Sequence, residues 1–147
     1  MQTGAKARNH RPAQGEMHTL VLDVLNDVIF HAAELQRFVP VTAGSFRCGD
    51  ERRGIEQFIE LITGLDWIVK SLDHVGIAKG LDFGTTTWEG EPLTAFAERF
   101  CSLLNEIAGA QQRRDWVLLA DLLDYELVPF LERWTALFTE LKENSPG

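Results

Sequence analysis

Apolar residues recur every three or four positions through residues 115–141, and this spacing predicts a helix with one broad buried face. That face consists of Trp116, Leu119, Ala120, Leu123, Leu127, Phe130, Leu131, Trp134, Leu137, Phe138 and Leu141. A second apolar strip lies beside it and consists of Leu118, Leu122, Tyr125 and Pro129. A helix that is apolar on two sides needs two neighbours, so the second strip predicts a contact with another segment or another protein.

A proline stands inside the apolar pattern of this last helix. Pro129 cannot donate a hydrogen bond to the carbonyl of Tyr125, and its ring crowds the same turn. The apolar spacing nevertheless continues to Leu141. We therefore expect the helix to bend at Pro129 rather than to stop there.

Two earlier segments show the same helical period. The first runs from Met17 to Val39 and ends at Pro40, and the second covers about 51–75 with Asp50 as its N-cap. The expected core of the first helix is Val21, Leu25, Val28, Ile29, Ala32, Leu35 and Val39. The expected core of the second is Ile55, Phe58, Ile62, Leu65, Val69 and Leu72.

A loop rich in glycine and threonine, residues 76–91, separates the second helix from a third. Pro92 stands at the first position of that third helix, Gly109 is its expected C-cap, and Asp115 caps the last helix. The third helix is expected to bury Leu93, Phe96, Ala97, Phe100, Leu103, Leu104 and Ile107.

These segments predict an all-α fold, an antiparallel four-helix bundle with a long loop between helices 2 and 3. Residues 1–15 are expected to form a polar tail, and residues 16–147 a single domain. A short strand has room only at Val39–Thr42 and at Asp82–Trp88.

Composition narrows the classes of partner. The 147 residues are 45% hydrophobic and carry a net charge of −8, which suits one packed domain and disfavours binding to nucleic acid or to an anionic membrane. The sequence shows neither a secretory leader nor an apolar run of membrane-spanning length, so a cytoplasmic location is expected. Cys48 and Cys101 are expected to be reduced thiols.

Candidate metal ligands are scattered. Glu-x-x-His, the pattern of metal sites in helical bundles, does not occur. Asp23, Asp27 and Glu34 fall opposite the apolar stripe of the first helix, with His31 at the boundary, and this pattern indicates a solvated acidic face. Four scattered histidines predict no metal site.

Two other groups of acidic residues allow an enzymatic interpretation. Asp66 and Asp73 are expected at the margin of the core of the second helix, where two carboxylates can bind a metal ion or exchange a proton. The plainer expectation is a boundary pair that arginine or backbone donors from a loop satisfy. Helical nucleotide pyrophosphatases bind Mg²⁺ with paired acidic motifs, and Asp121-x-x-Asp124 and Glu140-x-x-Glu143 match them weakly, because both lie on one helix.

The run DWVLLADLLDYELVPFLERW, taken with LITGLDWIVKSL, resembles small acidic helical proteins of Gram-positive bacteria. In size, acidity and helical content the chain also resembles the flagellar and type III export chaperones, which hold an apolar segment of a secreted subunit against a helical bundle. This likeness implies protein binding and assigns no residue to a site.

The sequence as a whole predicts a non-enzymatic, protein-binding helical bundle that acts as a homodimer, an adaptor or an export chaperone. Leu118, Leu122 and Tyr125 are the expected partner-binding residues, and no cofactor or metal is expected. The alternative is a metal-dependent hydrolase of the all-α pyrophosphatase type that uses Asp66, Asp73 and acids of the last helix.

Overall fold

The computed structural model of the chain describes residues 14–144. Two long helices come first, α2 (Gln14–Arg47) and α3 (Glu51–Lys79), and a tight turn joins them. A small antiparallel hairpin follows, made of β1 (Thr87–Trp88) and β2 (Glu91–Pro92).

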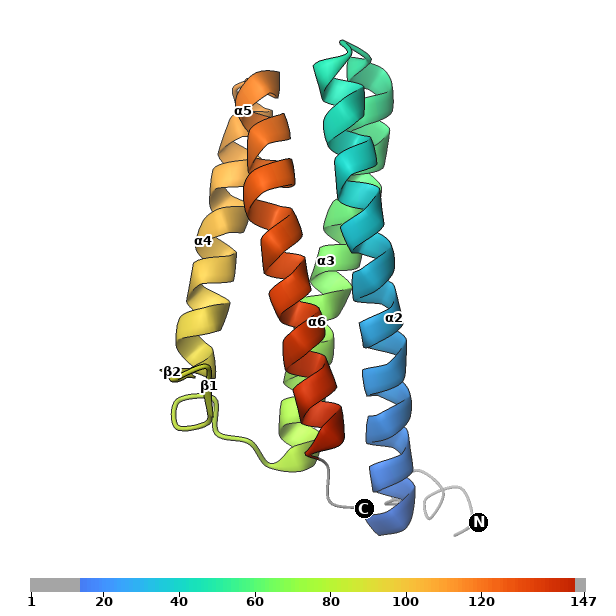
Figure 1. Cartoon of the computed structure of the whole chain (residues 1–147), viewed down its shortest axis with the longest axis vertical. Helices are drawn as coiled ribbons and strands as arrows, with labels where there is room; N and C mark the ends of the chain where they lie inside the picture. The colour runs from blue at the N-terminus through green and yellow to red at the C-terminus, as the bar shows by residue number, and fades with distance from the viewer. Residues whose placement is uncertain (1–13, 145–147) are drawn as a thin grey trace, which may run out of the picture.

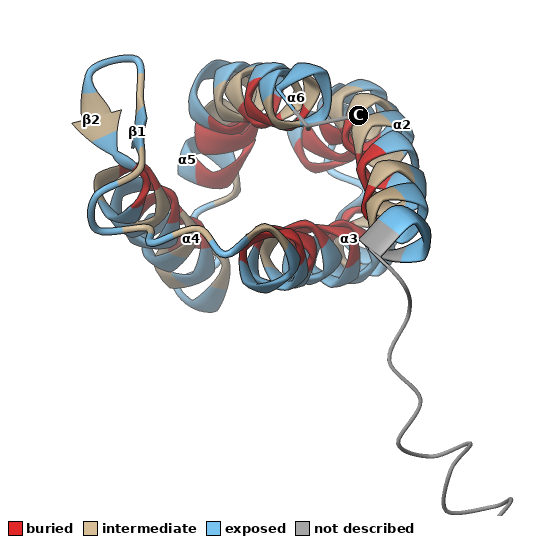
Figure 2. Ribbon diagram, turned by 90° about the horizontal axis from the view of Figure 1, so that it is seen from below, coloured by how far each residue is buried: buried red, intermediate tan, exposed pale blue. Residues whose placement is uncertain are grey.

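The second half of the described chain is again helical. It contains α4 (Leu93–Gln112) and then a continuous rod made of α5 (Trp116–Asp121), the π-helix η1 (Leu122–Leu127) and α6 (Val128–Glu143). The long helices lie side by side with the hairpin at one end of α4 (Figure 1), and their buried faces turn toward a shared centre (Figure 2). The predicted all-α class is confirmed.

Helix α2 is longer than predicted at both ends. It begins at Gln14, inside the expected tail, and it continues through Pro40 to Arg47. Pro40 is exposed, so the carbonyl that its missing N–H leaves unpaired lies on the solvent side of the helix. Val39 and Ala43 are fully buried on the adjoining, core-facing side. The apolar face therefore continues past the proline, and packing along it outweighs the cost of one lost hydrogen bond.

The buried face of α3 is rotated by about one position from the predicted one. Leu61 and Ile68 are fully buried, whereas Ile62, expected in the core, is 40% exposed. Phe58, Leu65 and Leu72 were correctly placed in the core. Spacing alone allowed both faces, because apolar residues occupy positions on each side of the true centre.

Glycines on the buried face of α3 explain why its neighbours approach so closely. A methyl group at Gly54 would lie 2.7 Å from the ring of Phe46, and one at Gly76 would lie 2.4 Å from the ring of Phe83. These contacts are shorter than carbon atoms tolerate. Small residues at these positions therefore let large rings from α2 and from the following loop pack on α3.

The connection from α3 to α4 is more ordered than a plain loop. Helix α3 extends to Lys79, and Gly80 ends it in the left-handed conformation (φ 67°). One of the two segments in which a strand had room, Asp82–Trp88, contains β1. Pro92 belongs to β2 and precedes the helix rather than starting it, and α4 runs past the expected C-cap Gly109.

The last helix changes its hydrogen-bonding pattern directly before Pro129. From Leu122 to Leu127 it is π-helical, and the N–H of Val128 donates to the carbonyl of Leu123, five residues back. A π-turn holds an extra residue, so it accommodates a proline ring that a regular α-turn would crowd. The rod continues as α6, in agreement with the expectation that Pro129 does not stop the helix.

Both predicted aspartate caps are present. Asp50 accepts a hydrogen bond from the N–H of Arg53 (3.2 Å), and Asp115 accepts one from the N–H of Leu118 (3.1 Å). None of the described helices has the length and apolarity needed to cross a membrane.

A pair of glycine substitutions tests the close packing of α3. Gly54→Ala should destabilise the protein by about 1–3 kcal/mol, because the ring of Phe46 is also stacked on Trp116 (centroids 5.0 Å apart) and has little room to move. Gly44→Ala is the control, because its methyl group would meet nothing within 4 Å and should add about 0.5–1 kcal/mol of helix stability. Urea unfolding measures both; equal effects would contradict the packing argument.

Candidate protein-binding surface

The predicted partner-binding strip is divided between the core and the surface. Leu122 is buried, with 8% of its surface exposed, whereas Leu118 and Tyr125 are 37% and 70% exposed. Leu122 lies three residues from Leu119 and directly before Leu123, both fully buried, so its side chain falls at the edge of the core face. Leu122 is therefore a core residue of this chain. The exposed apolar residues of this region are Leu118, Tyr125 and Val117.

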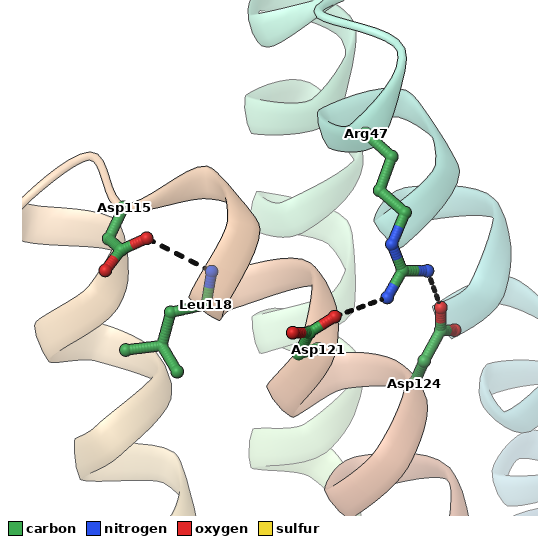
Figure 3. Close-up of polar contacts among 5 residues, drawn as sticks. All are labelled: Arg47, Asp115, Leu118, Asp121 and Asp124. Carbon is green, nitrogen blue, oxygen red and sulfur yellow. Dashed lines mark hydrogen bonds and ion pairs between the residues drawn. The ribbon is translucent and has the colours of Figure 1, made fainter.

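An arginine from α2 ties this region to the rest of the fold. Arg47 donates to Asp121 (2.8 Å) and to Asp124, and its guanidinium lies 5.9 Å from the centre of the Tyr125 ring. Figure 3 shows both aspartates turned toward Arg47. The hydrogen bonds that Arg47 donates to Asp124 and Asp121 raise the pKa of Arg47 above its ordinary value. Asp121 and Asp124, which the sequence suggested as a metal-binding motif, therefore join the last helix to Arg47 of α2.

A groove with mostly apolar walls runs between α2 and α3. Its volume is about 410 Å³. The residues that line the α2–α3 groove are His31, Glu34, Leu35, Arg37, Phe38, Val41 and Glu60. All but Glu60 come from α2, at positions three or four apart, so they form one edge of that helix.

His31 closes one end of the groove in an unusual way. Its ring meets Trp67 of α3 edge to face, with centroids 4.8 Å apart. Its Nε2 atom is buried and has no hydrogen-bond partner. Gly64 makes room for it, because a methyl group there would lie 3.0 Å from Nε2. The imidazole therefore packs as an aromatic wall between the two helices.

Exposed apolar side chains surround the groove. Val41 is 52% exposed in its wall, Trp67 is 40% exposed beside His31, and Phe30 is 67% exposed one turn from Glu34. Large apolar residues gathered at a concave site are typical of protein-binding surfaces. Val41 was not expected here because the predicted first helix ended at Pro40, and Phe38 was left out of the predicted core of that helix. The signal was present, since both residues continue the helical spacing from Leu35 across the proline.

The charges around the groove are mainly negative. Glu34 is ion-paired with Arg37 in the same turn of α2, but Glu60 on the opposite wall has no ion pair to any residue the structure describes. Asp27 and Asp23 lie one and two turns before His31 on the outer face of α2, and both are exposed. The acidic face predicted for this helix thus borders an apolar groove.

The remaining acidic candidates lie apart from one another. Asp66 is ion-paired with Lys70 (2.7 Å), and Asp73 is exposed. Neither borders the core as expected, because the buried face of α3 is turned away from them. Within residues 14–144, no three His, Cys, Asp or Glu side chains converge in a manner that would hold a metal ion. Cys48 and Cys101 are free and exposed.

A second arginine fixes the hairpin to the helices. Arg133 of α6 bonds to Glu89 (3.1 Å), and its guanidinium lies 5.3 Å from the ring centre of Trp88 and 5.1 Å from that of Phe96. The hairpin end of the predicted 76–91 loop is therefore held over the aromatic end of α4.

Comparison with protein families identifies one match. A family model described as "Domain of unknown function (DUF8042)" matches residues 34–137. The chain belongs to this family. The matched region includes the groove residues from Glu34 onward, and His31 precedes it. Comparisons with curated proteins and with solved structures give no match.

The Arg47 cluster can be tested by a double-mutant cycle. Arg47→Ala and Asp124→Ala should show a coupling free energy of about 0.5–1 kcal/mol, because the pair is partly exposed and water screens it. The control cycle is Arg52→Ala with Glu56→Ala, a more exposed pair within one helix that should couple by about 0.5 kcal/mol or less. Strictly additive effects at Arg47 and Asp124 in urea unfolding would show that the contact contributes no stability.

Acid should loosen the hairpin. A hydrogen bond from Arg99 lowers the pKa of Glu91 below its ordinary value. A carboxylate with a lowered pKa in the folded state adds stability above its unfolded pKa, and that stability is lost as the pH falls through the folded pKa. Glu91→Gln should therefore reduce the difference between the melting temperatures at neutral and acidic pH. Glu98→Gln, an exposed residue of α4 without a described ion pair, is the control; an equal reduction there would contradict the assignment.

Proposed function

We propose that this protein is an antiparallel four-helix bundle that works by binding another protein, as an adaptor or in the manner of an export chaperone. The α2–α3 groove carries this proposal. It combines apolar walls, an opening to solvent and exposed aromatic and aliphatic residues at its edges. A catalytic role has less support, because the acidic residues considered for it are ion-paired or stand apart.

Binding at this groove is expected to follow the pattern of a partner segment laid between two helices. Phe38 and Val41 supply apolar surface on α2, and Trp67 supplies it on α3 beside His31. A partner that covers them removes apolar area from water, which favours association by about 25 cal/mol for each Å² covered. Helix α2 is held on its other face by the core, so the groove is formed before a partner arrives.

The strip at α5 and η1 is the less favourable contact surface of the two. Leu122 packs inside the fold, and the ring of Tyr125 lies near the guanidinium of Arg47. Leu118 and Tyr125 remain accessible to a partner, but they form no groove of the kind seen between α2 and α3. We therefore assign the main contact to the α2–α3 groove and a secondary one to Leu118 and Tyr125.

A charge placed in the groove should weaken partner binding without unfolding the protein. Val41→Glu puts a carboxylate on a wall that the partner must cover, and its desolvation should lower affinity by about tenfold or more. Because Val41 is 52% exposed, helicity by circular dichroism should not change. Quantitative mass spectrometry of proteins that co-purify from the native host measures the loss.

Ile77→Glu is the matched control, since Ile77 is an 80% exposed apolar residue of α3 outside the groove. It should leave the same partners bound. Light scattering of the purified variants measures self-association in parallel. If Val41→Glu retains every partner that the parent protein captures, the groove is not the binding surface.

A further inference from the structure

We propose that the α2–α3 groove takes an amphipathic helix of a different protein, one whose apolar stripe is flanked by lysine or arginine. This inference rests on the proposed function and specifies the chemistry of the partner. It follows from the length of the groove, from the hydrogen-bonding needs of what fills it and from the charges on its two walls.

Length and backbone chemistry favour a helix. The lining residues of α2 extend from His31 to Val41, a distance of about 15 Å, or close to three helical turns. The groove presents side chains of two helices whose backbone groups already bond within each helix. An extended peptide would find few backbone partners there, whereas a helix satisfies its own N–H and C=O groups.

The charges favour a basic partner. Glu34 and Glu60 stand on opposite walls, and the only cation among the lining residues is Arg37, which is ion-paired with Glu34. Asp23 and Asp27 extend the negative surface along α2 toward its start. A helix with a basic residue on each flank would place one near Glu34 and one near Glu60, and such complementary charges speed association and select partners.

Two other occupants fit the groove less well. A second copy of this chain carries a net charge of −8 and would bring like charges together. Residues 1–13 of the chain itself are basic, with Lys6, Arg8 and Arg11 and no acidic residue, but Met1 is their only large apolar side chain. That segment matches the charges and not the apolar walls. A foreign amphipathic helix matches both.

A pair of designed peptides tests this inference on the full-length protein. Each is a fluorescent helix of about 18 residues, long enough to be helical in water, with a leucine stripe. One carries lysine on both flanks of the stripe, and the other carries glutamate at the same positions. We expect saturable binding of the lysine peptide by fluorescence anisotropy, weaker binding as salt rises, and affinity for the glutamate peptide at least about tenfold lower.

Three variants locate the site of binding. The double variant Glu34→Gln with Glu60→Gln should lower the affinity for the lysine peptide by about threefold to tenfold. The control, Glu98→Gln with Glu106→Gln, removes two exposed charges of α4 and should change that affinity by less than about twofold. Val41→Ser, which removes apolar contact without adding charge, should weaken it as well. Equal effects of the two charge-neutralising pairs would overturn the inference, because they would indicate nonspecific attraction to an acidic protein.

Other outcomes separate this inference from the proposed function. Equal affinity for the two peptides, both weakened by Val41→Ser, overturns the basic partner and leaves protein binding at the groove intact. If the protein binds neither peptide but forms a dimer, and only Val41→Glu dissociates that dimer, a second copy is the occupant. Deletion of residues 1–13 that raises peptide affinity more than about tenfold identifies that segment as the occupant. If neither peptide binds and Val41→Glu still retains the host partners, both proposals are overturned.

Discussion

Burial of one face of α2 along nearly its whole length is the constraint on which the fold depends. Helix α3 packs along one side of that face, and α5, η1 and α6 pack along the other. Residues at both ends of the helix contribute, from Val21 to Phe46, each less than 10% exposed. Had α2 ended at Pro40, Ala43 and Phe46 would be lost from this face, and with them the ring that stacks on Trp116.

The contact between α4 and α6 is of a different kind, because large rings fill the space between them. Trp134 meets Phe96 and Phe100 edge to face, with centroids 4.9 and 5.2 Å apart, and stacks on Phe138. Rings of this size keep the two backbones apart while burying much apolar area. The indole N–H of Trp134 is buried without a hydrogen-bond acceptor. This unpaired donor offsets part of the free energy gained by burying the ring.

Under the proposed function, two different faces of helix α2 serve stability and binding. Its inner face holds the core, and its edge beside α3 forms most of the groove. The groove walls are therefore rigid, because packed residues such as Leu35 belong to both surfaces. Under the proposed function, a substitution at an exposed wall residue should act on binding alone, whereas one at Leu35 should act on the core as well. Exposed residues of the proposed binding site can therefore be substituted without disturbing the core.

The sequence by itself determined the all-α class, the aspartate caps at Asp50 and Asp115, and most of the buried face of the last helix, because capping chemistry and helical period are local properties. Only the tertiary structure decided what depends on neighbouring elements. Packing on both sides carried α2 through Pro40, and packing against neighbouring helices buried Leu122, which was expected in the surface strip. The groove belongs to this second class, since its walls come from two helices whose relative rotation no local pattern specifies.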